Sequence, residues 1–416
     1  MKILFVSGCA PATFNHGEPN SYPYYLIKEM ARRHEVYVGY FSVNKQLGDQ
    51  KIHSELQTAG VRLYKKLNPQ PLLHIFSKGL YVARVAILKF FLLLRITPPA
   101  TLIPLPFAVY KKRHAVGLRE VISEFNPDLA IVFPLQLRFS IIAMRKLGIP
   151  VSLLCTDSLA LHFERLMETQ SPDLRTKTYQ HYIQARELEK GYGRIEATYL
   201  FVGEKDKEAF QSYSKQGNCY FIPHHLYSYA KEEKNWSTSS QSLNVIFAGG
   251  GNTIYTGNEA DNIAQKIAGY AGLDKRSLHF YFLGHGYELA ISSLKNAGYA
   301  VTHQTWVSDY DEHMKHMHIQ IFPIIMGTGT KAKVLAAMSS GLLCIGTWYS
   351  FENIQAEDKE HYLQYNKSEE VPQLLESIDS ARAKFKEMSE RGRSQVLEMH
   401  MTEKVVDKLL ALSGKK

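Results

Sequence analysis

The sequence predicts an α/β protein built from two Rossmann-like βαβ domains, and three features of the chain lead to this prediction. At 416 residues it is too long for one ordinary hydrophobic core. Short apolar runs alternate with helical patterns in two separate series, which predicts two parallel sheets with helices on both faces. A polar stretch at 229–242 separates the two series and is the expected interdomain linker. We expect a ligand in a central cleft that the two domains face.

The first series begins with MKILFVS, a glycine-containing loop and YPYYLIKEMARRHEVYVGYF, in which Leu26 and Met30 are at helical spacing. Further strands of this series are expected at 128–133, 151–156 and 198–203. The second series has expected strands at 243–250, 278–284, 319–325 and 342–347, and residues 370–412 are expected to be helical. We therefore predict an N-terminal domain over 1–232, a C-terminal domain over 233–395 and a last helix, 396–416, that packs back on the N-terminal domain.

The composition is that of a globular protein, with 45% apolar and 21% charged residues, and excludes a disordered chain. The four cysteines are far apart and form no CxxC pair, so they predict buried thiols in a reducing compartment. The apolar run at the N-terminus is too short for a signal peptide. We expect a cytoplasmic protein.

The net charge of +9 arises from one segment that contains no Asp or Glu, between residues 56 and 119. Its eleven basic residues are Arg62, Lys65, Lys66, Lys78, Arg84, Lys89, Arg95, Lys111, Lys112, Arg113 and Arg119. Within it, residues 72–95 form an amphipathic helical pattern whose cations share one broad sector and whose other face is apolar. Charges and four following prolines exclude a spanning helix. A basic amphipathic segment at 72–113 is typical of a helix that lies on an anionic membrane surface, and the alternative is a buried helix whose cations reach solvent.

The strongest chemical motif is PIIMGTGTKAKVLAAMSSGLLCIGT at 323–347. An expected strand leads into GTGTK, and an expected helix follows directly. Glycines at 327 and 329 allow a ligand to approach the backbone, amide groups at the helix start point toward it, and Lys331 adds a positive charge. This arrangement suits a diphosphate, although a Gly-Thr-Gly before a helix is often only a turn.

With these residues the sequence resembles the group 1 glycosyltransferases, whose donor-site signature usually reads GxGxKxKVLEAMAxGxPVVxT. Other segments resemble the same family in the same order: RRHEVYV, CTDSLALHFERL, VGEKDKEAF, FAGGGNTIYTGNEADNI and WVSDYDEHMKHMHIQIFPII. The resemblance implies a GT-B fold, an acceptor-binding N-terminal domain and a C-terminal domain that holds a nucleotide-diphosphate sugar. It also implies transfer with retention of configuration. The acid-free basic segment adds the expectation of a lipid-linked or cell-envelope polysaccharide acceptor at the inner membrane face, and we expect no metal or other cofactor.

The resemblance also assigns roles to individual residues. Gly250 and Gly251 would lie close to the phosphates, Gly17 would bring the N-terminal backbone near the donor, and Asp157 would face the transferred sugar or the acceptor hydroxyl. The diphosphate and sugar would be bound by Gly327, Thr328, Gly329, Thr330 and Lys331, with Lys331 neutralising the leaving group. Leaving-group stabilisation would then be the main protein contribution, and no pair of catalytic carboxylates is required.

One position departs from the family pattern: Ala336 stands where the family has the Glu that holds the ribose. Glu352 is the nearby carboxylate that the sequence offers in its place. Two alternatives stay open. The same fold is also that of a sugar-nucleotide epimerase, and Ala336 permits a non-catalytic nucleotide-sugar-binding subunit that partners an active transferase.

Several histidines are weaker candidates. His313, His316 and His318 do not share a helical face and predict no metal site. His224 and His225, and His16 with Glu18, lie in loops expected near the cleft and are possible substrate contacts. No GxGxxG with a distant acidic residue, Walker loop, GxSxG or kinase motif is present, and the aliphatic character of the basic segment argues against nucleic acid.

Overall fold

The computed structural model describes residues 1–13, 18–41, 48–67, 83, 86–87, 90, 116–170, 172–227, 236 and 242–413. The chain forms two compact units. The N-terminal unit comprises Met1–Tyr227 together with Thr402–Lys416, and the C-terminal unit comprises Ser228–Met401. The chain therefore passes from one unit to the other twice, at 227/228 and at 401/402.

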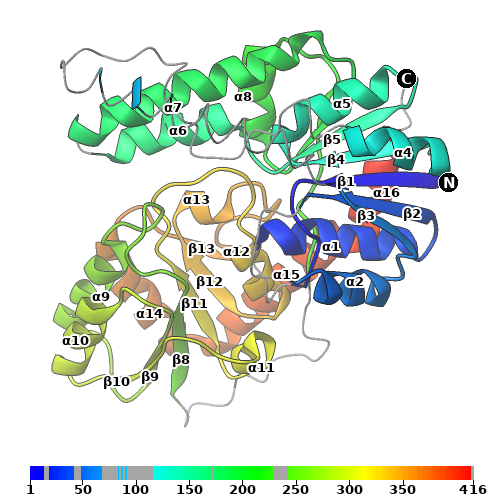
Figure 1. Cartoon of the computed structure of the whole chain (residues 1–416). Helices are drawn as coiled ribbons and strands as arrows, with labels where there is room; N and C mark the ends of the chain where they lie inside the picture. Colours follow the sequence, from blue (N-terminus) through cyan, green and yellow to red (C-terminus); the bar gives the residue numbers. More distant parts are fainter. Residues whose placement is uncertain are drawn as a thin grey trace. The chain divides into compact units, whose positions relative to one another are not determined.

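The N-terminal unit is built on a parallel sheet in the order β3-β2-β1-β4-β5-β6-β7 (Figure 1). Its strands are β1 (Lys2–Ser7), β2 (Glu35–Tyr40), β3 (Leu63–Lys66), β4 (Leu129–Phe133), β5 (Val151–Cys155), β6 (Thr198–Phe201) and β7 (Cys219–Phe221). The order reverses between β1 and β4, so the loops after these strands diverge at the carboxyl edge of the sheet.

Helices cover both faces of this sheet, because successive side chains of a strand point to opposite faces. In β1, Ile3 and Phe5 pack into one buried cluster with α1 and α16, whereas Leu4 and Val6 pack into the other with α4. The helices of the unit are α1 (Glu18–Ala31), α2 (Asp49–Thr58), α4 (Val116–Phe125), α5 (Arg138–Arg145), α6 (Leu159–Thr169), α7 (Pro172–Lys190), α8 (Glu204–Ser214) and α16 (Thr402–Ser413).

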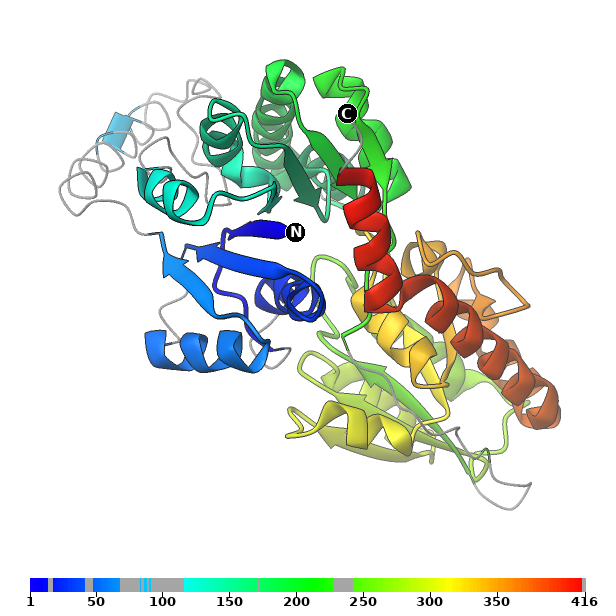
Figure 2. The same ribbon diagram turned by 90° about the vertical axis from the view of Figure 1, so that its right-hand side faces the viewer.

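The last helix, α16, belongs to the N-terminal unit although it follows the whole C-terminal unit in sequence (Figure 2). Its Val405, Val406 and Leu409 are buried against the first cluster, which stabilises the unit by about 1.5–3 kcal/mol for each side chain. Polar contacts add to this packing. The Asp407 carboxylate accepts from Arg33 at 2.6 Å, and the Ser413 hydroxyl is hydrogen-bonded to that of Ser152 at 2.7 Å.

The C-terminal unit contains a second parallel sheet in the order β10-β9-β8-β11-β12-β13. Its strands are β8 (Leu243–Ala248), β9 (Leu278–Leu283), β10 (Ala300–Gln304), β11 (Ile319–Phe322), β12 (Leu343–Gly346) and β13 (Leu363–Gln364). Its helices are α9 (Glu259–Gly269), α10 (Glu288–Asn296), α11 (Tyr310–Lys315), α12 (Ala332–Ser339), α13 (Trp348–Phe351), α14 (Val371–Ser380) and α15 (Arg382–His400).

The predicted α/β class with two Rossmann-like sheets is confirmed. Each expected strand is present, and residues 371–413 are almost entirely helical. Most of the expected linker at 229–242 lies outside the described residues. Trp236 is an exception: only 7% of it is exposed, and it packs into the core of the C-terminal unit.

The basic segment also falls largely outside the described residues, and Lys78, Arg84, Lys89, Arg95 and the cations at 111–113 are among those not described. Four residues of the expected amphipathic helix, Ala83, Ala86, Ile87 and Phe90, are helical, and all four are exposed. Nowhere in the described ranges is there a helix with the length and apolar character needed to cross a bilayer.

Candidate functional site

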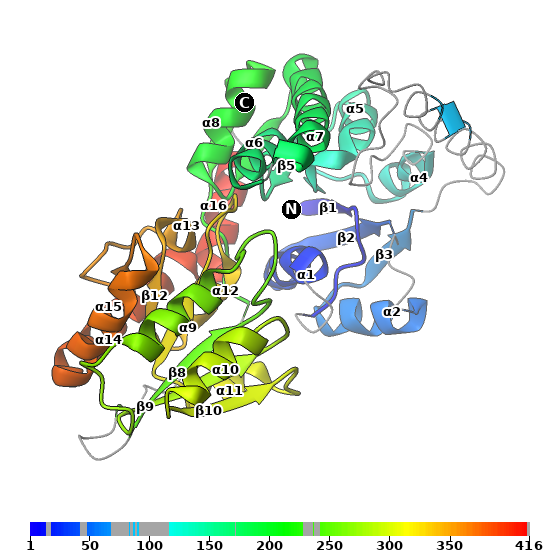
Figure 3. The ribbon, with the colours of Figure 1, turned by 90° about the vertical axis from the view of Figure 1, so that its left-hand side faces the viewer.

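The two glycine-bearing loops predicted to bind a ligand lie at one edge of the C-terminal sheet. Strands β8 and β11 are parallel neighbours, so their carboxyl ends meet at the same edge (Figure 1; β8 and α12 are also labelled in Figure 3). The β8 loop (residues 249–257) follows β8, and the GTGT loop (residues 327–330) follows β11 and leads into α12. A backbone hydrogen bond of 2.9 Å from the Ile325 amide to the Tyr255 carbonyl ties the two connections together.

The GTGT loop is held in shape by two side chains. The Lys331 ammonium donates to the carbonyls of Thr328 and Gly329 at 2.9 and 3.0 Å, and the Asn353 amide donates to the Gly329 carbonyl at 3.1 Å. Gly329 has a φ of +61°, a conformation that glycine adopts without strain. Lys331 is the N-cap residue of α12 and has extended backbone angles, so the loop delivers the chain directly into the start of that helix.

The β8 loop is shaped by close backbone packing. At Gly251 a Cβ would lie 2.3 Å from the Gly286 carbonyl oxygen and 2.5 Å from the Tyr287 ring. The Thr256 hydroxyl stabilises the loop by hydrogen bonds to the Thr253 hydroxyl at 2.9 Å and to the Gly250 and Gly251 carbonyls, both at 3.3 Å. Gly251 thus allows the β8 loop to lie tightly against the loop after β9, and Gly250 allows the β8 loop to fold closely on itself, since a Cβ there would lie 2.4 Å from Cγ2 of Thr253.

Lys333, in the first turn of α12, lies beside the β8 loop and is not among the site residues predicted from the sequence. Its Nζ lies so close to the β8 loop that a Cβ on Gly249 would be 2.5 Å from it. Lys333 therefore connects the start of α12 with the glycines after β8. The sequence did carry a signal for it, since Lys333 matches the second lysine of the GxGxKxK signature.

Two further positions from the sequence analysis belong to the same unit. Glu352 is half-buried at the C-terminus of α13, directly before Asn353. Ala336 is half-buried within α12. Gly250, Gly251, the GTGT loop, Lys331 and Glu352 are thus all on loops at the carboxyl edge of one sheet.

Asp157 belongs to the N-terminal unit, in the short turn between β5 and α6, and is half-buried. Two buried carboxylates hold this turn. The Ser158 amide donates to Asp206 at 2.8 Å, and the Ser158 hydroxyl donates to Glu189 at 3.0 Å. Ser158 also caps α6, since its hydroxyl accepts from the Leu161 amide at 3.2 Å.

Burial raises the pKa of Glu189 to about 7, because the charged carboxylate is withdrawn from water. Hydrogen bonds from the Ala160 amide, the Ser158 hydroxyl and the Leu159 amide oppose this effect. The turn that carries Asp157 is therefore attached to a carboxyl group that titrates near neutrality.

The remaining candidates from the sequence have different outcomes. Gly17 and His16 lie outside the described residues, as does the side chain of Glu18. His224 and His225 are 2% and 1% exposed and pack against the ring of Tyr22. These two histidines are part of the core rather than of an open surface.

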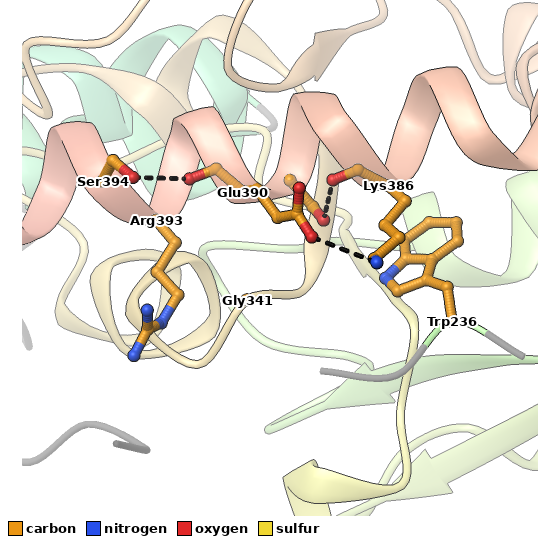
Figure 4. A pocket seen from close by; sticks show the side chains of 7 residues that line it. Trp236, Gly341, Lys386, Glu390, Arg393 and Ser394 are labelled. Carbon is orange, nitrogen blue, oxygen red and sulfur yellow. Dashed lines mark hydrogen bonds and ion pairs between the residues drawn. The ribbon is translucent and has the colours of Figure 1, made fainter. Parts of the chain in front are cut away.

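The C-terminal unit also contains a small cavity of about 120 Å³ between α15 and Trp236 (Figure 4). Lys386 and Glu390 form an ion pair of 3.4 Å in its wall, and none of the predicted site residues lines it. Sites for drug-sized ligands typically occupy about 300–1,000 Å³. This cavity is therefore too small for a nucleotide sugar. Among the described residues no group of His, Cys, Asp and Glu is arranged to hold a metal ion.

Comparison with known proteins gives one family. Residues 245–380, which include the β8 loop and the GTGT loop, match the family model described as glycosyl transferases group 1. No curated protein is similar in sequence to this chain.

Solved structures resemble the chain over nearly its whole length. HepE of Anabaena in complex with UDP and glucose is 12% identical, with a TM-score of 0.61, and the match covers 99% of this chain and 98% of that one. The sucrose-phosphate synthase of Thermosynechococcus elongatus is 12% identical, with a TM-score of 0.64 and coverages of 99% and 98%. TarM of S. aureus, in a complex that includes UDP, is 8% identical, with a TM-score of 0.64 and full coverage of both chains. At these identities the similarity establishes the fold, which is GT-B as predicted.

Proposed function

We propose that the protein is a group 1 glycosyltransferase with the GT-B fold and that it takes its sugar from a nucleotide-diphosphate donor held by the C-terminal unit. The observation that carries the proposal is the meeting of the β8 loop and the GTGT loop at the carboxyl edge of one parallel sheet. Ligands of open α/β sheets bind at this edge, and a glycine-bearing loop at a helix start favours phosphate.

In this proposal each part of the site has a separate task. Amide groups at the start of α12 and in the GTGT loop bind the diphosphate, and the backbone of the β8 loop at Gly250 and Gly251 lies close to it. Lys331 gives the GTGT loop its shape and adds positive potential where the leaving group develops charge. Asp157 of the N-terminal unit is assigned to the sugar or the acceptor hydroxyl, and Gly17 to the approach of the N-terminal backbone.

A panel of nucleotide sugars and nucleoside diphosphates tests the donor class. UDP and UDP-glucose are the first compounds to try, because solved HepE complexes contain them. A ligand at 100 times its Kd stabilises the protein by about 2.7 kcal/mol, which thermal unfolding detects. Lys331→Ala should weaken that binding, because it removes both the charge and the two hydrogen bonds that hold the GTGT loop. If no nucleoside diphosphate stabilises the wild type, the proposal is wrong.

The reaction itself is proposed to retain the configuration of the sugar. NMR of the product made from an α-linked donor distinguishes retention from inversion, and an inverted product would contradict the proposal. Formation of a new sugar nucleotide without any acceptor would instead indicate an epimerase.

For the acceptor we propose a lipid-linked or cell-envelope glycan at an anionic membrane surface. Support comes from the acid-free basic segment and from Ala83, Ala86, Ile87 and Phe90, an exposed apolar stripe at the i, i+3, i+4, i+7 spacing of one helical face. Ile87 is 46% and Phe90 59% exposed. One of the similar solved structures, WaaB, is a lipopolysaccharide outer core galactosyltransferase.

Co-sedimentation with vesicles containing anionic lipid tests this part. A variant with Lys78, Arg84, Lys89 and Arg95 changed to Glu should no longer sediment with the vesicles, because each basic residue near an anionic surface contributes about 1 kcal/mol to binding. The matched control reverses four exposed lysines of the C-terminal unit, namely Lys275, Lys295, Lys367 and Lys384. Equal retention of both variants on the vesicles would refute the membrane assignment.

A further inference from the structure

We propose that Lys333 is the cation that contacts the phosphates of the donor, whereas Lys331 maintains the loop around them. This inference rests on the proposed function and deepens it by assigning a binding residue. It follows from the different directions in which the two lysines extend from the start of α12.

Lys331 is directed back into its own loop. Its Nζ donates to the carbonyls of Thr328 and Gly329, and a Cβ on Gly327 would lie 2.8 Å from its Cε and 3.3 Å from its Nζ. An ammonium group has three donors, and two of them are used within the GTGT loop. Lys331 is thus built into the turn.

Lys333 extends the other way, from α12 to the β8 loop. Its Nζ is beside Gly249, which directly follows β8 and has a φ of +117°, and the residue as a whole is exposed. The amine lies beside the Gly249 backbone, which carries no side chain. The proposed function assigns this loop and the loop before α12 to the diphosphate. A phosphate oxygen bound by the first amides of α12 would lie within reach of this ammonium.

The charge environment supports the same assignment. The β8 loop and the GTGT loop contain no Lys or Arg, so these loops can bind an anion only through backbone and hydroxyl groups. Lys333 supplies a full positive charge and hydrogen-bond donors at the place where these neutral groups converge. Charge-assisted hydrogen bonds to phosphate are roughly twice as strong as neutral ones.

Titration calorimetry with UDP and with uridine tests the role of Lys333. Lys333→Met should weaken UDP binding by about 10- to 100-fold, the effect of losing a hydrogen bond to a charged group, and should change uridine binding less than twofold. Lys333→Arg keeps the charge and should recover most of the UDP affinity. The matched control is Lys275→Met, which removes an exposed lysine before β9, at the opposite edge of the sheet.

A second variant tests the geometry without removing the charge. Gly249→Ala places a methyl carbon 2.5 Å from the Lys333 Nζ, which forces the amine to move, and should also lower UDP affinity more than uridine affinity. Gly298→Ala is its control, because Gly298 has a comparable φ of +92° but its added Cβ would only touch Lys275 at 3.6 Å.

These measurements distinguish a failure of the Lys333 assignment from a failure of the proposed function. Unchanged UDP affinity in Lys333→Met, or equal losses for UDP and uridine, overturns the assignment of Lys333 and leaves the proposed function standing. If neither UDP nor any other nucleoside diphosphate binds the wild type, both the proposed function and this inference are wrong.

Discussion

The buried carboxyl of Glu189 leads to a prediction about stability and pH. Burial raises its pKa from 4.5 to about 7, so between these values the folded protein keeps a proton that the unfolded chain has lost. The unfolded state binds fewer protons in this window, and stability therefore falls as the pH rises from about 4.5 to about 7. A shift of this size corresponds to about 3 kcal/mol.

Glu189→Gln should remove this dependence, because the amide stays neutral and still offers an oxygen to the Ala160 amide and a donor to Ser158. At pH 5 the variant and the wild type should unfold at similar temperatures. At pH 8 the variant should be more stable by about 3 kcal/mol, which is about 6–12 °C in Tm for a unit of this size.

Differential scanning calorimetry between pH 5 and pH 8 is the assay, with Glu187→Gln as the control. Glu187 lies in the same helix but is exposed and pairs with Lys190 at 3.4 Å, so its variant should follow the wild type at every pH. A constant difference in Tm between Glu189→Gln and the wild type across this range would refute the reasoning.

Three further changes test the site in the C-terminal unit. Gly251→Ala forces a Cβ to 2.3 Å from the Gly286 carbonyl and should lower stability by about 1–3 kcal/mol in thermal unfolding, whereas Gly269→Ala, which has open space around it, should not. Asn353→Gly keeps the positive φ of 70° but removes the hydrogen bond to Gly329, so the KM for the donor should rise about two- to tenfold; an unchanged KM would show that Asn353 does not support the loop. Ala336→Glu restores the carboxylate of the family pattern and should lower the Kd for a nucleoside diphosphate by about tenfold or more, and a Kd equal to that of the wild type would contradict a ribose contact at this position.

The strands that the sequence predicts are those in the interior of the two sheets. β1, β4, β5, β8 and β11 are largely buried and read as short, mainly apolar runs. The four edge strands β3, β7, β10 and β13 are not predicted by the sequence. β10, for example, has the sequence AVTHQ and is largely exposed, so it carries no apolar run to detect.

In the site, too, the features that are contiguous in sequence are predictable and the contacts between distant residues are not. The β11–GTGT–α12 connection is contiguous in sequence, and glycines before an expected helix indicate a phosphate loop without knowledge of tertiary structure. The hydrogen bond from Asn353 to Gly329 joins residues 24 positions apart, and the bond from Ser158 to Asp206 joins residues 48 apart. No local pattern reports such contacts, because they depend on which elements the sheet order brings together.

The return of α16 to the N-terminal unit has a consequence for the order in which the chain matures during translation. Residues 228–401 are contiguous, so the C-terminal unit is complete as soon as Met401 has left the ribosome. The N-terminal unit is synthesised first but still lacks Val405, Val406 and Leu409, and its first core cluster is completed only when α16 emerges. A nascent chain that stops before residue 402 would leave an apolar surface on β6 and α1 uncovered, and such a product is a natural target for chaperones and proteases.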